Sequence, residues 1–206
     1  MKYKILKDGN NPVNCNSYLI YNVETLDAYI IDAPTKTKLF IDEINEKNLN
    51  LKYVLLTHGH WDHIMSLDFW RENYDIEVVA HKECETYLNN PKYNLSYRVM
   101  PEISTNADIY LENESGEFDI FKYIRTPGHS FDSVSYILGN AVFCGDVIFY
   151  ESVGRTDLIG SDPNDLVKSI REKIYQFNDK TNLLPGHGQN TTVAHEKKYN
   201  PFVPVN

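Results

Sequence analysis

The chain reads Thr57-His58-Gly59-His60-Trp61-Asp62-His63 directly after the apolar run Val54-Leu55-Leu56. If the backbone leaves this strand still extended, His58 and His60 point to the same side, because side chains alternate along an extended chain. Asp62 and His63 then fall in the first turn of a helix, where adjacent side chains diverge by roughly 100°. Zinc and similar cations take these nitrogen and oxygen ligands. The stretch therefore predicts a metal site.

The same pattern of an apolar strand, a glycine and a metal-type side chain recurs three times further along the chain. The pairs are Gly128-His129, Gly145-Asp146 and Gly186-His187. In layered α/β proteins, ligands gather in the crevice outside strand ends, where loops from several strands converge. Four such strand ends predict a polynuclear site, and we expect the glycines to clear space for metal and substrate.

The rest of the chain alternates between strand and helix signals. We expect strands at 16–21, 28–31, 54–56, 78–80, 118–124, 134–138, 141–144 and 183–184, and helices at 36–48, 62–74 and from Asp162 to about Phe177. In the first helix, Leu39, Phe40 and Ile44 are expected to lie on one side, and Asp162 is expected to cap the last. The order predicts two packed sheets with helices outside, a layered α/β architecture.

Composition limits the class of protein. A length of 206 residues suits a single domain spanning 1–206, and 42% hydrophobic with 24% charged residues is ordinary for a globular chain. The net charge of −9 disfavours nucleic acid as a partner, because phosphate binding needs clustered Lys and Arg. There is neither an apolar leader segment nor a run of membrane-span length, so no membrane partner is expected. Three cysteines are too few for a disulfide framework, which favours the cytoplasm. The oligomeric state is left open.

These residues resemble the metallo-β-lactamase superfamily, whose signature is an HxHxDH run followed by distal His, Asp and His. The resemblance is closest to the small glyoxalase II-like hydrolases. It rests also on the stretch Gly154-Arg155-Thr156-Asp157-Leu158 and on the ending Gly186-His187-Gly188, Thr191-Thr192 and Asn200-Pro201-Phe202. Two segments depart from the family pattern: Met65-Ser66 stands where Gly-Gly is common, and Ser130-Phe131-Asp132-Ser133 stands for Thr-Pro-Gly-Ser. The resemblance implies a four-layer αββα sandwich.

The family also implies two divalent metal ions, zinc first, with iron or manganese as the other options. Carried over residue by residue, the resemblance assigns His58, His60 and His129 to one metal and Asp62, His63 and His187 to the other, with Asp146 bridging. It further implies that a hydroxide shared by metals about 3.5–4 Å apart attacks the substrate, and that Asp62 orients it.

The resemblance favours hydrolysis of a small-molecule thioester of the acyl-glutathione or acyl-thiol type. One alternative is a mononuclear non-haem iron persulfide dioxygenase of the same superfamily, because His58, His129 and Asp146 alone make a 2-His-1-carboxylate set. A non-catalytic metal-binding protein is a third reading, which the complete ligand set disfavours. A secreted β-lactamase is disfavoured by the absence of a leader. The native metal, the acyl group and the thiol carrier are left open.

Other polar residues near these motifs receive weaker assignments. Tyr150 and Arg155 follow the metal Asp and are candidates for substrate contact, while Asp157 is expected to pair locally with Arg155. His81 is interpreted as a structural residue and His195 as exposed. Cys144 is expected to face the same side as Asp146, two residues on, whereas Cys15 and Cys84 are interpreted as packing residues.

Overall fold

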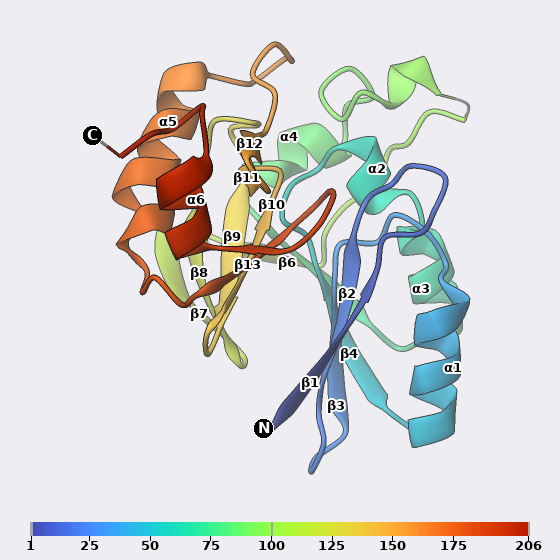
Figure 1. Cartoon of the computed structure of the whole chain (residues 1–206). Coiled ribbons are helices and arrows are strands. Elements are labelled where there is room, and N and C mark those ends of the chain that lie inside the picture. The colour runs from blue at the N-terminus through green and yellow to red at the C-terminus, as the bar shows by residue number, and fades with distance from the viewer. Residues whose placement is uncertain (1, 100, 206) are drawn as a thin grey trace.

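Two six-stranded sheets form the centre of the protein, and the computed structural model describes residues 2–99 and 101–205 (Figure 1). The first sheet has the order β1-β2-β3-β4-β5-β6, with parallel pairing from β3 to β6. Its strands are β1 (Tyr3–Asp8), β2 (Ser17–Asn22), β3 (Asp27–Ile31), β4 (Asn50–Leu55), β5 (Glu77–His81) and β6 (Ile109–Leu111).

The second sheet has the order β14-β13-β10-β9-β8-β7, and only β10 and β13 are parallel. Its strands are β7 (Ser115–Phe118), β8 (Phe121–Arg125), β9 (Val134–Leu138), β10 (Ala141–Gly145), β13 (Asn182–Pro185) and β14 (Thr191–Thr192). A separate small hairpin joins β11 (Ile148–Phe149) to β12 (Ser152–Val153) and follows β10 directly.

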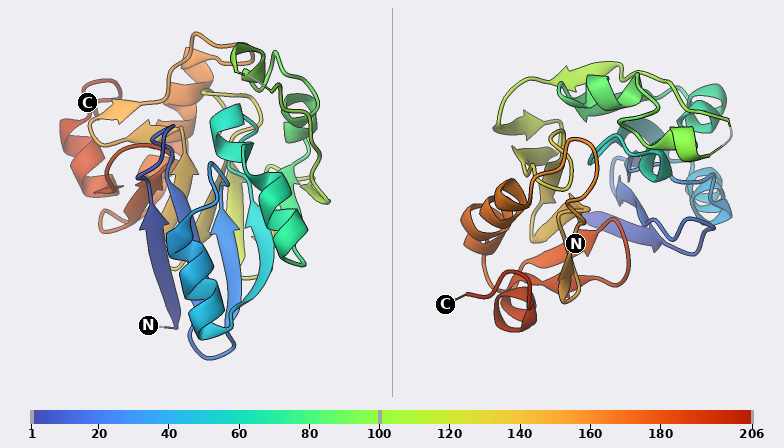
Figure 2. Two further views of the ribbon diagram at one scale, coloured as in Figure 1. Left: turned by 90° about the vertical axis from the view of Figure 1, so that its right-hand side faces the viewer. Right: turned by 90° about the horizontal axis from the view of Figure 1, so that it is seen from above.

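Helices cover the outer face of each sheet (Figures 1 and 2). On the first sheet lie α1 (Lys38–Lys47) and α3 (Leu67–Asn73), and on the second lie α5 (Pro163–Glu172) and α6 (Val193–Tyr199). The remaining short helices are α2 (Trp61–Ile64), α4 (Cys84–Leu88), η1 (Ser96–Arg98) and η2 (Ile174–Gln176). The predicted αββα arrangement is confirmed.

Alternation along the strands produces three buried layers. In β2, Tyr18 and Ile20 face the second sheet, whereas Leu19 and Tyr21 face the helices α1 and α3. In β10, Phe143 faces the first sheet. The strands are therefore apolar on both faces, which explains the continuous hydrophobic runs in the sequence.

Several sequence-based boundaries need correction. The expected helix at 62–74 is two helices, because the Ser66 N–H and hydroxyl both donate to the Ala33 carbonyl, each at 2.9 Å, and break the run. The expected strand at 118–124 is a hairpin that turns at Asp119. Leu39 is exposed, whereas Phe40 and Ile44, four residues apart, are buried. Asp162 does cap α5, accepting from two backbone N–H groups.

The short elements β1, α4 and α6 are absent from the sequence-based expectation. Within residues 2–99 and 101–205, no helix combines the length and apolar character that a membrane span requires.

Candidate metal centre

The predicted ligands meet where strands of both sheets end. The first sheet contributes His58 and His60 from the loop after β4, and Asp62 and His63 from α2. The second contributes His129 after β8, Asp146 after β10 and His187 after β13. Because the two parallel pairs β3–β4 and β10–β13 end near one another, Asp62 and His187, 125 positions apart in the sequence, become neighbours.

One group of ligand atoms consists of imidazole nitrogens alone. A ring nitrogen from each of His58, His60 and His129 lies within 4.8 Å of the others, and all three residues are buried. The Nδ1 atom of His60 and the Nε2 atom of His129 are 2.9 Å apart. The Nε2 atoms of His58 and His60 have no hydrogen-bond partner among the described residues. Buried nitrogens left without a partner are costly, so this arrangement is suited to a cation.

Asp146 lies between this group and the other imidazoles. Its Oδ2 atom is 3.6 Å from His129 Nε2 and 3.5 Å from His187 Nε2, and its Oδ1 atom is 3.4 Å from His63 Nε2. His58, His63 and Asp146 also form a second group of ligand atoms within 4.8 Å. The carboxylate is therefore placed to reach metals on both sides.

Asp62 lies on the solvent side of this second group. Its Oδ2 atom is 3.4 Å from His187 Nε2, and both side chains are partly exposed, at 22% and 28%. His63, by contrast, is fully buried, and its Nε2 has no hydrogen-bond partner among the described residues. The structure thus brings all seven predicted ligands together.

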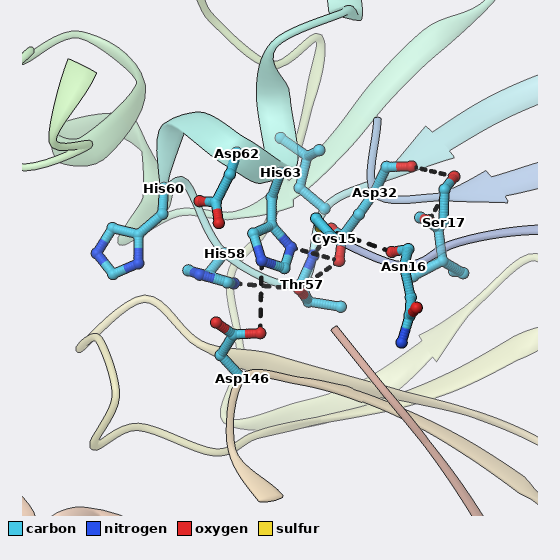
Figure 3. Close-up of polar contacts among 12 residues, drawn as sticks. Cys15, Asn16, Ser17, Asp32, Thr57, His58, His60, Asp62, His63 and Asp146 are labelled. Carbon is cyan, nitrogen blue, oxygen red and sulfur yellow. Dashed lines mark hydrogen bonds and ion pairs between the residues drawn. The ribbon is translucent and has the colours of Figure 1, made fainter. Parts of the chain in front are cut away.

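A buried carboxylate that the sequence analysis did not identify holds the HxHxDH loop in place (Figure 3). Asp32 follows β3 and accepts from the Thr57 N–H at 2.8 Å and from the Thr57 hydroxyl at 2.7 Å. Its Oδ2 atom is also 2.8 Å from His63 Nδ1. This contact makes Nδ1 of His63 the protonated nitrogen and leaves Nε2 as the lone-pair donor. An Asp directly after a buried strand, as at Asp146, was the sequence signal for it.

Other imidazoles are oriented by backbone carbonyls. His129 Nδ1 is 2.9 Å from the Arg155 carbonyl, and His187 Nδ1 is 2.8 Å from the Asn14 carbonyl. Asp132, in one of the two segments that depart from the family pattern, accepts from the Gly59 N–H at 2.8 Å. That departure therefore anchors the turn between His58 and His60.

The three glycines that precede His129, Asp146 and His187 make room for protein atoms and not for metal or substrate, which corrects the expectation; a Cβ at Gly128 would meet the backbone of Leu166. Gly145 adopts φ +50°, and a Cβ there would meet the Thr57 side chain. A Cβ at Gly186 would meet both the Asp146 carboxylate and the His63 ring. The turn at Gly145 also ends the strand alternation, so that Cys144 packs in the core under α5 while Asp146 faces the site.

The imidazoles fall into two classes according to whether their surroundings lower or raise their pKa. Burial and the neighbouring imidazoles hold the pKa of His58 well below its usual range, and burial together with His129 lowers the pKa of His60 to about 3. At His63, burial alone would lower the pKa. The acidic groups of Cys15, Asp32 and Asp146 outweigh burial and raise the pKa. At His187, burial is likewise outweighed by Asp62 and Asp146, and the pKa is raised.

The carboxylates of Asp146 and Asp62 stay ionised in this setting. Burial would raise the pKa of Asp146, but the surrounding imidazoles His63, His129 and His187 lower it well below its usual range. At Asp62, burial alone would likewise raise the pKa. The hydrogen bond with His187 and the charge of His63 outweigh burial and lower the pKa.

A pocket of about 420 Å³ opens over these ligands. Its walls are formed by His60, Trp61, Asp62, Leu95, Arg98, His129, Asp146, Phe149, Ser152, Val153, Arg155, Leu158 and His187. Arg155, a candidate for substrate contact, lines it, and its guanidinium is held by Asp157 at 2.6 and 2.7 Å. Arg98, on η1, is an additional basic residue with no sequence signal.

Tyr150 is not brought to the pocket. Its ring stacks on His195 of α6, with centroids 4.6 Å apart, so that Phe149 and Ser152 of the hairpin line the wall in its place. His195 is partly buried, not exposed as expected, and its Nε2 is 2.9 Å from Glu151 Oε1. His81 is buried at the end of β5 and is in none of the groups of clustered ligand atoms.

Similarity to known proteins extends over almost the whole chain. Residues 10–187 match the Metallo-beta-lactamase superfamily. The chain is 36% identical over 211 residues to the probable metallo-hydrolase YqgX of Bacillus subtilis, covering 98% of each chain. It is 33% identical over 198 residues to the hydroxyacylglutathione hydrolase GloC of Haemophilus influenzae, covering 92% of each.

Solved structures show the same fold. The B3 metallo-beta-lactamase BLEG-1 has a TM-score of 0.89 at 35% identity, covering 97% of this chain and 99% of that chain. TTHA1623, solved in a di-iron-bound form, has a TM-score of 0.83 at 28% identity, covering 96% and 99%. These likenesses support a metal-dependent hydrolase as the class of protein.

Proposed function

The chain belongs to the metallo-beta-lactamase superfamily, and on that premise we propose that it is a dinuclear metallo-hydrolase acting on a thioester of the acyl-glutathione or acyl-thiol type. The observation that carries the proposal is the set of buried donors without partners, the Nε2 atoms of His58, His60 and His63 and Oδ1 of Asp146, beneath an open pocket. Nitrogen and carboxylate oxygen donors of this kind fit zinc, iron or manganese.

The residues divide into two ligand sets in this proposal. His58, His60 and His129 would hold one metal, Asp62, His63 and His187 the other, and Asp146 would bridge them. Two such metals supply Lewis acidity that activates water and polarises a carbonyl oxygen. Because ligands come from both sheets, we propose that residues 1–206 act as one domain. Three buried free thiols are consistent with a cytoplasmic location.

The pocket walls support an anionic thioester. Arg98 and Arg155 present cationic groups at the rim, while Leu95, Phe149 and Leu158 offer apolar surface to an acyl chain. Asp62, partly exposed at the pocket floor, accepts a proton from water or orients it beside His187. Its lowered pKa keeps this carboxylate ionised at neutral pH.

The test is thiol release from acyl-glutathione by protein reconstituted with zinc, iron or manganese, with metal content measured in the same samples. We expect close to two metals per chain and turnover that requires them. Asp62→Asn should lower kcat, and His81→Gln, outside the ligand groups, should not. Saturation at one iron, with oxygen consumed in the presence of a persulfide, would instead establish the dioxygenase alternative.

A second candidate function is β-lactam hydrolysis, which the 35% identity to BLEG-1 favours. A chromogenic β-lactam and acyl-glutathione are compared at equal concentration on the same preparation. We also expect Arg98→Ala to raise KM for acyl-glutathione and to leave KM for an uncharged acyl-thiol unchanged. Faster turnover of the β-lactam would reverse the substrate assignment.

A further inference from the structure

The thiol of Cys15 lies beside His63 and His187, two of the three residues (with Asp62) proposed above to hold the second metal. Its Sγ atom and one ring nitrogen each of His63 and His187 lie within 4.8 Å of one another. Cys15 and His187 are also paired through their backbones as an isolated antiparallel bridge. The bridge fixes the backbones of the two residues side by side.

The sulfur has little else to bind. Cys15 is fully buried, and its Sγ contact with the Asn16 carbonyl is long, at 3.7 Å. It is a free thiol. On the neighbouring His63, the Nε2 atom is also buried and has no hydrogen-bond partner among the described residues. A free thiol with one long contact and an imidazole that has an unpartnered nitrogen thus lie together, next to His187.

Resting on the dinuclear function proposed above, we propose that Cys15 is an additional ligand of the metal held by His63 and His187. Zinc lies about 2.3 Å from a thiolate sulfur and about 2.0–2.1 Å from an imidazole nitrogen, so one ion can contact atoms up to about 4.4 Å apart. The observed spacing, within 4.8 Å, is close to this limit. On coordination the S–H bond would break, the proton would leave to solvent, and the metal would take its place on the sulfur.

A thiolate changes which metal this position favours. Thiolates select zinc, cobalt and cadmium over manganese and magnesium, which prefer oxygen ligands. The other proposed ligand set contains imidazole and carboxylate only. The two positions therefore differ in softness, and the position beside Cys15 is the thiophilic one.

The experiment uses metal-free full-length protein loaded with two equivalents of Co²⁺ and followed by absorption spectroscopy. A cobalt–thiolate bond gives a sulfur-to-metal charge-transfer band in the near ultraviolet, which imidazole and carboxylate ligands do not give. We expect the band in the wild type and in Cys84→Ser and Cys144→Ser, and its loss in Cys15→Ser. The two control thiols are as buried as Cys15 but lie in none of the groups of clustered ligand atoms.

Competition between metals gives a second readout. Cys15→Ser should weaken Cd²⁺ binding at one position by at least about tenfold, the smallest effect typical of losing even an outer-shell partner, and leave Mn²⁺ binding unchanged. Absence of the charge-transfer band from the folded wild-type protein overturns the proposal, whether or not Cys15→Ser folds.

Elemental analysis separates this proposal from the proposed function. Two cobalt ions per wild-type chain without the band refute the Cys15 ligand and leave the dinuclear hydrolase standing. One cobalt ion per chain together with the band would support the Cys15 ligand and refute the dinuclear hydrolase. The two failures are therefore distinguishable in a single set of samples.

Discussion

Asp32→Asn changes one atom of a buried carboxylate and should disable one metal position. In the wild type, Asp32 accepts from Thr57 twice and contacts His63 Nδ1 at 2.8 Å. An asparagine must turn its NH₂ group toward either Thr57 or His63, and that group donates only. Facing His63, it favours the tautomer with the proton on Nε2, the nitrogen that the metal needs.

The magnitude follows from the number of bonds disturbed. One buried donor left without an acceptor costs about 1–3 kcal/mol, and hydrogen bonds to a charged acceptor are worth about 1.5–3 kcal/mol. Because the two figures describe the same disturbed contact and do not add, we expect the free energy of unfolding to fall by about 1–3 kcal/mol. Affinity for the metal at His63 should fall by about 10–100-fold, as is usual when the outer partner of a ligating imidazole is lost.

Metal titration by calorimetry and urea unfolding of the metal-free protein measure the two effects separately. Asp119→Asn is a matched control, because Asp119 also adopts a positive φ, 48° against 57° at Asp32, and accepts from Tyr29 and Lys52. Asparagine tolerates that backbone at both positions. Wild-type affinity for two metals in Asp32→Asn would refute the role of Asp32 in setting the tautomer.

Three further outcomes are expected. Asp146→Ala should remove metal from both sets and lower turnover at least about a hundredfold, beyond the loss of an outer-shell partner, whereas His81→Ala should stay within a few-fold; an equal loss in both would show that the ligand list is incomplete. As pH falls from 8 to 4.5, protons compete first for His63 and His187, whose pKa values are raised, so their metal should leave before the other; elemental analysis showing simultaneous release would contradict this. Glu196→Gln should destabilise the protein by about 1–3 kcal/mol and raise KM more than it lowers kcat. The reason is that buried Glu196 accepts from the Glu151 N–H at the tip of the β11–β12 hairpin, which lines the pocket. An unchanged KM in steady-state assays would count against this role of Glu196.

Much of the site was predictable because its ligands adjoin strong local signals. An apolar strand, a glycine and a His or Asp can be recognised without knowing where the rest of the chain lies. Asp32 follows the same kind of strand but has no glycine beside it, and its role depends on Thr57 and His63 arriving from elsewhere. Arg98 and Cys15 reach the site only through tertiary contacts, which local periodicity does not encode.

The boundaries that differ have similar causes. The helix expected at 62–74 has a helical pattern throughout, yet it breaks at Ser66 because two donors find the same carbonyl in a distant loop. Tyr150 was assigned to substrate from its position after the metal Asp, but the partner that captures its ring is on α6, a helix too short to give a clear sequence signal.

The origin of the ligands in both sheets has a consequence for how the molecule comes apart. His58, His60, Asp62 and His63 belong to the first sheet and its connections, and His129, Asp146 and His187 to the second. An ion bound by either proposed ligand set would therefore cross-link the two halves of the polypeptide, and the ion held by Asp62, His63 and His187 would close a loop of 125 residues between Asp62 and His187. Each sheet keeps its own backbone ladder and outer helices without the ions. We therefore expect withdrawal of the ions to loosen the contact between the two halves before either sheet unfolds, so that the pocket between them opens first.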